Sequence, residues 1–90
     1  MQTMETEALK AAIAANGADA MWSDRAIWMI EALEGSGISP NSPTLLDDMR
    51  AAQSDHPKIA EFLVSIPSDD VHAATQLSYL TMQVNAAMLS

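Results

Sequence analysis

VHAATQLSYLTMQVNAAMLS, which runs from Val71 to Ser90, contains no Asp, Glu, Lys or Arg. Apolar side chains recur along it at intervals of four, three, four and three residues, at Ala73, Leu77, Leu80, Val84 and Ala87. This spacing places them on one face of an α-helix, as in the seam of a coiled coil. The stretch therefore predicts a long C-terminal helix that packs on the rest of the chain through this seam.

A second face of the same predicted helix carries Tyr79, Met82 and Ala86. A helix with a solvated face usually displays charges there, often as pairs four residues apart, and this one has none. Two interpretations follow. The face is either the centre of the domain's core or a surface on which a second molecule docks, and the sequence leaves both open.

The composition of the remaining chain also favours helices. Of its 90 residues 49% are hydrophobic, so the chain has enough apolar material to fold, yet only 4% are aromatic. Much of the apolar fraction is Ala and Met, which favour helices, whereas residues that favour strands are scarce. We predict one all-α domain over residues 1–90, a compact small bundle of about four to five short helices with the longest at the C-terminus.

Local signals predict where these helices begin. Thr3 can cap the first helix, and Asp19 or Ser23 the second. Ser42 is a candidate cap for the third, because Pro43 would then occupy the first helical position, where a missing N–H costs nothing. The fourth is expected to start at Ser54 or Asp55, and the fifth at Ser68.

Local signals also predict where these helices end. Asn16-Gly17 ends the first and Gly35-Ser36-Gly37 the second, since Gly tolerates the left-handed conformation that closes many helices. Pro57 limits the third, because its ring clashes with a preceding helical turn.

Charge narrows the classes of partner. The net charge is −8, and the chain has four basic residues in total. Binding to phosphate backbones or anionic lipid depends on Lys and Arg, so we expect no direct nucleic-acid binding and no membrane partner. The chain has no Cys and no apolar stretch long enough to span a bilayer, and its first sixteen residues do not resemble a signal peptide. These features predict a soluble, cytoplasmic protein.

Candidates for chemistry are few. Asp69, His72 and Gln76 would share a face at the start of the last helix. One histidine and one carboxylate are too few ligands for a closed zinc site, so we interpret Asp69 as serving the helix N-terminus and His72 as a solvated residue. No pattern typical of a nucleophile, a phosphate loop or a calcium loop is present. We therefore expect no enzymatic activity, no metal and no cofactor.

Surface recognition remains, and the tryptophans are its best markers. Trp22 belongs to the apolar stripe of the second predicted helix and is expected in the core, whereas Trp28 falls outside that stripe. Since Trp is frequent in interface hot spots, Trp28 is a candidate anchor for a partner, with Asp24 and Glu31 on either side of it. Tyr79, Met82 and Ala86 complete the predicted partner-binding set.

The favoured functional hypothesis is a small acidic, non-catalytic protein-binding domain that acts as an inhibitor or adaptor of another protein with a basic surface. In its charge it is similar to phage-encoded or mobile-element inhibitors of host defence systems, which occupy a basic nucleic-acid groove on their target. The alternative is a structural subunit that assembles with itself, including a homodimer through the C-terminal helix.

One fragment supports that alternative. PNSPTLLDDM, from Pro40 to Met49, resembles the centre of type III secretion needle subunits, in which a P-x-x-P turn precedes a Leu-Leu pair. The resemblance covers ten residues and implies a helical hairpin whose second helix runs uninterrupted to the C-terminus. Pro57 and Pro67 depart from that pattern, because each interrupts a helix.

Overall fold

Helices account for all the regular structure in the computed structural model, which describes residues 2–16 and 20–89. Within these residues the chain forms five α-helices and no strand, as predicted. They are α1 (Gln2–Asn16), α2 (Ala20–Leu33), α3 (Leu45–Ala52), α4 (Pro57–Val64) and α5 (Asp70–Leu89). The prediction that the C-terminal helix is the longest is also confirmed, since α5 has 20 residues.

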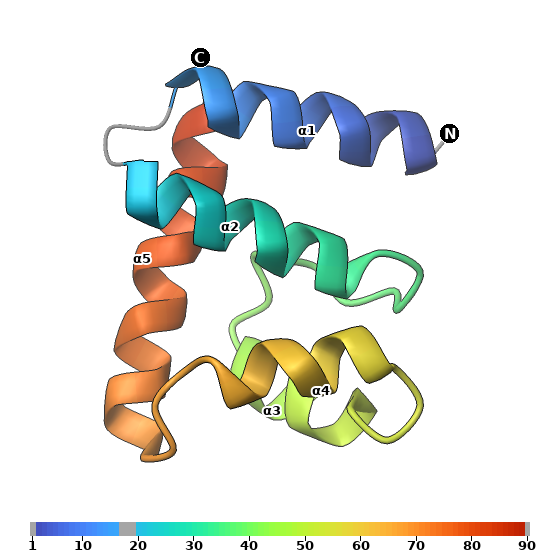
Figure 1. The fold of residues 1–90 in the computed structure, drawn as a ribbon, viewed down its shortest axis with the longest axis vertical. Coiled ribbons are helices and arrows are strands. Elements are labelled where there is room, and N and C mark those ends of the chain that lie inside the picture. The colour runs from blue at the N-terminus through green and yellow to red at the C-terminus, as the bar shows by residue number, and fades with distance from the viewer. Residues whose placement is uncertain (1, 17–19, 90) are drawn as a thin grey trace.

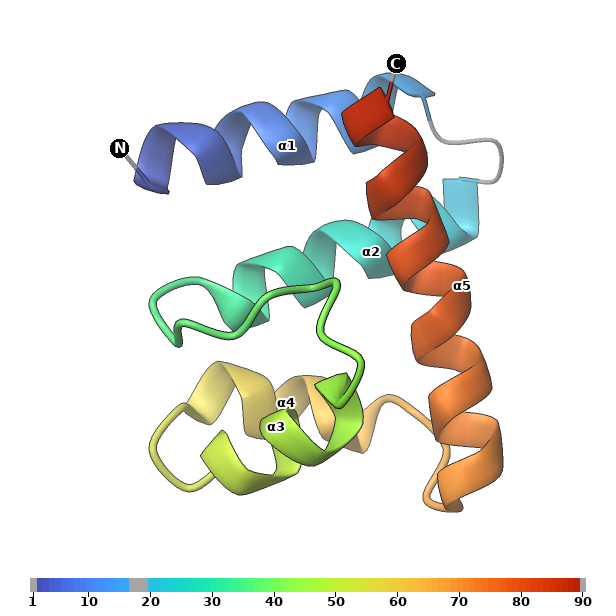
Figure 2. The same ribbon diagram turned by 180° about the vertical axis from the view of Figure 1, so that it is seen from behind.

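The helices form two layers, each made of an antiparallel pair, and α5 connects the layers. α1 and α2 lie side by side and run in opposite directions, and α3 and α4 lie beyond α2 (Figure 1). α5 crosses these layers along one flank, as the reverse view in Figure 2 also shows, and it contacts α1, α2 and α3. The radius of gyration is 12.2 Å, in line with the value of about 12 Å expected for a compact domain of this length.

One apolar core lies between the helices, and α5 supplies much of it. Every residue of its predicted seam is buried. The remaining buried apolar residues come from the other four helices and the segment after α4: Ile13, Ala26, Met29, Ile30, Ala32, Leu33, Leu45, Met49, Ile59, Phe62 and Ile66. The four, three spacing in the sequence thus identified the face of α5 that holds the molecule together.

α2 ends where the glycine turn was predicted. Gly35 and Gly37 both have φ of +79°, in the left-handed region that residues with a side chain rarely adopt. The Ser36 hydroxyl donates a hydrogen bond to the Leu33 carbonyl, at 2.6 Å. This bond satisfies one of the carbonyls left without a partner at the helix end.

Several predicted helix starts are wrong by a few residues. α1 already includes Thr3, and α4 begins at Pro57 after His56. Asp19 lies outside the described residues, whereas Ser23 lies within α2. The cap of α5 is Asp69 rather than Ser68, because a carboxylate oxygen of Asp69 accepts the backbone N–H of His72, at 3.3 Å.

α3 begins two residues later than predicted, after a turn that is held by hydrogen bonds to Asp48. The hydroxyls of Ser42 and Thr44 both donate to Asp48, at 2.8 and 3.1 Å. The Thr44 carbonyl accepts the first helical hydrogen bond, from the Asp48 N–H at 2.8 Å, so α3 begins at Leu45. Pro43 therefore sits in the turn before the helix rather than at its first position.

The hairpin implied by the needle-subunit resemblance is not formed. α3 ends at Ala52, and the chain turns before Pro57 and again between α4 and α5. The Pro40–Met49 fragment is a turn followed by the start of an eight-residue helix. In the part of the chain that the structure describes, every helix is too short or too polar to traverse a lipid bilayer.

Candidate protein-binding surfaces

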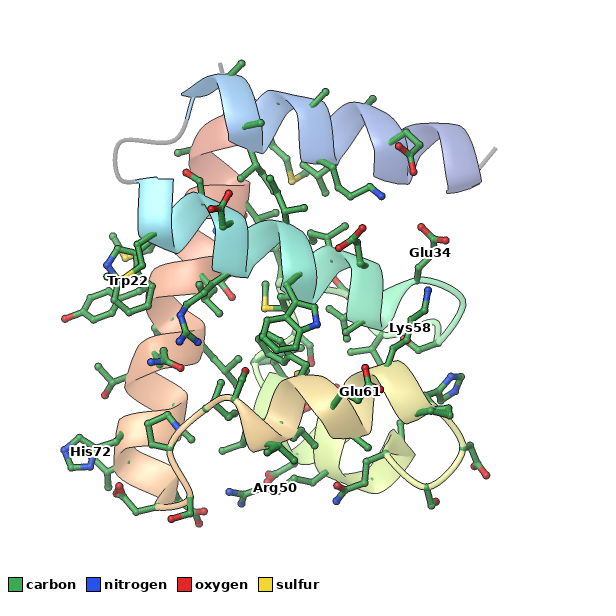
Figure 3. All side chains as sticks on the ribbon, viewed as in Figure 1. Trp22, Glu34, Arg50, Lys58, Glu61 and His72 are labelled. Atoms are coloured by element: carbon green, nitrogen blue, oxygen red, sulfur yellow. The ribbon has the colours of Figure 1, made fainter. Side chains whose placement is uncertain are left out.

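Asp69 and His72 form a local pair at the start of α5. The His72 ring is hydrogen-bonded through Nδ1 to a carboxylate oxygen of Asp69, and both side chains are exposed (Figure 3 labels His72). The side-chain hydrogen bond from His72, followed by its backbone N–H, lowers the pKa of the Asp69 carboxyl below its ordinary value. Asp69 thus caps the N-terminus of α5, as the sequence predicted.

Gln76 does not join this pair. Its amide oxygen is buried and has no hydrogen-bond partner among the described residues. Across residues 2–16 and 20–89, no three His, Cys, Asp or Glu side chains lie close enough together to hold a metal ion. The Asp69–His72 pair is therefore a capping arrangement on the surface of the molecule.

A cleft of about 510 Å³ lies between the start of α3 and α5. Its charged lining residues are Asp47 and Asp70, and Asp70 forms an ion pair with Arg50, at 2.7 Å. Thr81 lies in the same cleft and donates a hydrogen bond to the Pro40 carbonyl, at 3.0 Å, which ties the segment before α3 to α5. The described lining offers hydroxyls and carboxylates but no histidine or lysine to act as a base beside them.

The outer face of α2 brings together three of the predicted partner-binding residues. Trp28 is 37% exposed, and its ring meets Phe62 of α4 edge-on, with centroids 5.4 Å apart. Asp24 lies one turn before Trp28 and Glu31 about one turn after it, and both are exposed. Trp28 therefore combines an open aromatic surface with a fixed position, because Phe62 is fully buried and supports it.

The carboxylates around Trp28 differ in their partners. Glu31 accepts from Lys10 of α1, at 3.4 Å, and Lys10 also pairs with Glu7, at 2.9 Å. Asp24 has no ion pair within the described residues. Glu61, which the sequence analysis did not select, is exposed on α4 next to Phe62, and in the view of Figure 3 it lies below α2 with Lys58 beside it. We call Asp24, Trp28, Glu31 and Glu61 the acidic face.

No protein-family model, curated protein or solved structure matches this chain. The candidate sites are therefore defined by the geometry of this chain.

The remaining predicted residues lie on α5, on the side away from the core. Tyr79 and Met82 are 49% and 61% exposed, and Ala86 is exposed as well. Their exposure answers one half of the question that the sequence left open, because this face is not the centre of the domain's core. That a second molecule docks on this face stays a prediction.

Trp22 packs against the core, as the sequence predicted, but it is only partly buried and also borders this second surface. It lies in the first turn of α2, and its ring contacts the Tyr79 ring of α5, with centroids 5.5 Å apart. Val71, which was not among the predicted residues, is 72% exposed on the same side of α5. The available signal was its spacing, since Val71 precedes Tyr79 by two intervals of four residues.

Proposed function

We propose that this protein works by binding a partner protein with a basic surface, through the acidic face centred on Trp28, as an inhibitor or adaptor of that partner. The observation that carries the proposal is the half-open Trp28 ring held edge-on by buried Phe62, with carboxylates one turn away on either side. A central aromatic anchor surrounded by polar residues is the usual anatomy of an interface hot spot.

The charge of the whole chain supports the same proposal. A net charge of −8 draws a basic partner toward the molecule and raises the association rate, most strongly at low salt. Asp24 and Glu61 have no ion pair among the described residues, so they can meet Lys or Arg of a partner without breaking an existing contact. Glu31 would share its charge between Lys10 and the partner.

We place the partner among proteins that bind nucleic acid, because such proteins concentrate Lys and Arg in the groove that holds the phosphate backbone. By occupying that groove, the acidic face would compete with nucleic acid for the same basic side chains. Added duplex DNA is then expected to release the bound partner at constant ionic strength. Partner binding that is indifferent to DNA would contradict this identification while leaving the acidic face itself in place.

The acidic face is tested by matched charge reversals. Asp24→Lys and Asp55→Lys each change the net charge from −8 to −6, but Asp55 lies in the turn between α3 and α4 and is not part of the acidic face. Affinity capture at low salt with the wild-type chain identifies partners. Their affinities for the two variants then show which partners bind the acidic face. We expect Asp24→Lys to lower the affinity for a true partner at least about tenfold, as loss of a hot-spot contact does. Asp55→Lys should leave that affinity unchanged.

Trp28→Ala provides the second arm, with Val64→Ala as its control, because Val64 is an exposed apolar residue of α4. Binding should be lost with Trp28→Ala and kept with Val64→Ala, with circular dichroism confirming that both variants are folded. Equal weakening by the two lysine substitutions would mean that only total charge matters. That result, or full binding by folded Trp28→Ala, would refute the proposed site.

A further inference from the structure

The side of α5 opposite its buried seam is an apolar face without charge. It consists of Val71, Thr75, Tyr79, Met82 and Ala86, all exposed, and we call it the outer face of α5. Two residues, or about 200° of helical rotation, separate Leu80 from Met82. α5 is therefore apolar on two opposite sides, which is typical of a helix that is covered on both.

We infer that the outer face of α5 binds the same face of a second copy of this chain, in an antiparallel pair. Two copies that each carry −8 repel each other over most of their surfaces. The repulsion is smallest where neither surface is charged, and α5 has no Asp, Glu, Lys or Arg beyond Asp70. A basic partner, by contrast, gains no Coulomb attraction from a neutral face.

The order of residues on the face favours the antiparallel arrangement. A two-fold axis between Ser78 and Tyr79 places Met82 of one copy opposite Thr75 of the other, and Val71 opposite Ala86, so that a larger side chain meets a smaller one on either side of the axis. A parallel pair would place Met82 against Met82 and Val71 against Val71. Its faces would be less complementary in shape.

Charge at the ends of α5 favours the same arrangement. A parallel pair would bring Asp69 and Asp70 of both copies together at one end. In the antiparallel pair these acids lie beside the last turns of α5 of the other copy, where no side chain is charged, and the two helix dipoles oppose each other. The Trp22 ring, packed on Tyr79, widens the contact at the two-fold axis.

The pairing is tested by the molar mass of the full chain in solution, from micromolar to millimolar concentration. We expect the mass to rise from 9.6 kDa toward twice that value. Met82→Lys should raise the dissociation constant at least about tenfold, since it places a charge in the contact. Met88→Lys is the matched control, because Met88 is 60% exposed on the same helix but about 120° around it from Met82.

Salt separates this inference from the proposed function. Screening weakens the attraction between the acidic face and a basic partner, but it relieves the repulsion between two acidic copies, so added NaCl should strengthen the dimer. The inference is overturned if the wild-type chain stays monomeric at every concentration, or if Met82→Lys and Met88→Lys dissociate alike. A wild-type monomer that loses a different protein on Met82→Lys would also overturn it.

Cysteine pairs test the direction of the helices, since the chain has no cysteine of its own. A mixture of Val71→Cys and Ala86→Cys chains should form a disulfide-linked dimer under mild oxidation. Val71→Cys alone should not, because the two copies of residue 71 would lie about 22 Å apart along the helices, beyond the reach of a disulfide. A linked dimer from Val71→Cys alone would show a parallel pair instead.

Discussion

At the scale of single residues, Ser23 of α2 has a buried hydroxyl without a hydrogen-bond partner among the described residues. It is 5% exposed in α2, and its hydroxyl makes no hydrogen bond within the described part of the chain. Burial of such a group costs about 1–3 kcal/mol, and Ala is the better helix former. We expect Ser23→Ala to raise the free energy of unfolding by about 0.5–2 kcal/mol, measured by urea denaturation.

Ser78→Ala is the control for that measurement. Ser78 is exposed on α5, and its hydroxyl already donates to the Ala74 carbonyl, at 3.0 Å. Its replacement should change stability less than Ser23→Ala does, since no unsatisfied group is removed. A fall in stability with Ser23→Ala would show that the hydroxyl has a partner in solution.

At the scale of elements, the start of α5 should respond to acid through Asp69. The pKa of this carboxyl is lowered in the folded state, first by the side-chain hydrogen bond from His72. A group with a lowered folded pKa adds stability above its unfolded pKa, near 3.8 here, and loses that contribution as pH falls through the folded value. Asp69→Asn keeps an acceptor for the cap but cannot titrate.

The wild type should therefore exceed Asp69→Asn in stability above about pH 5, and the difference should shrink below about pH 4. Denaturant titrations at several pH values measure it. His72→Ala, which removes the ring donor, should shrink the same difference. A gap between wild type and Asp69→Asn that is constant from neutral pH to pH 3 would contradict this account.

The elements also show what could be predicted from the sequence. The seam of α5 was predicted completely, because its spacing is set by helix geometry alone. The starts of α3 and α5 were missed by one or two residues, because several capping groups lie close together there and compete: Asp69 rather than Ser68 accepts the His72 N–H, and Ser42 accepts the Thr44 N–H in the turn before α3. Such a competition is decided by three-dimensional geometry, which sequence spacing does not contain.

The candidate surfaces were predictable only in part. Trp28 was recognised because it falls outside the apolar stripe of α2, and the structure leaves it half open. The exposure of Tyr79 and Met82 was not predictable, since this second side of α5 is also uncharged and largely apolar, and only the packing of the other helices shows that it is left uncovered. Glu61 was not predicted because its place below α2 depends on the packing of α4 against α2, which are far apart in the sequence.

At the scale of the whole molecule, the excess of negative charge should make stability depend on salt. Twelve acidic residues face four basic ones, so repulsion outweighs the few surface ion pairs. Raising NaCl from about 0.01 to 0.15 M shortens the screening length from about 30 to 8 Å. We expect the melting temperature at neutral pH to rise by a few degrees, as measured by circular dichroism.

The same scan near pH 4.2, the isoelectric point of the chain, is the control. Net repulsion is absent there, so the melting temperature should hardly change with salt. A melting temperature that falls with salt at neutral pH would mean that ion pairs such as Arg50–Asp70 outweigh the repulsion.

The contact between Trp22 and Tyr79 gives this protein an optical property of its own. Tyr79 is the sole tyrosine of the chain, and its ring lies 5.5 Å from that of Trp22. Excitation energy passes from tyrosine to tryptophan over separations several times longer, so the folded protein should fluoresce almost entirely as tryptophan. When α2 and α5 separate, energy transfer from Tyr79 to Trp22 decreases, and tyrosine emission should reappear. The unlabelled chain therefore reports on the separation of these two helices, independently of the molar-mass and capture experiments.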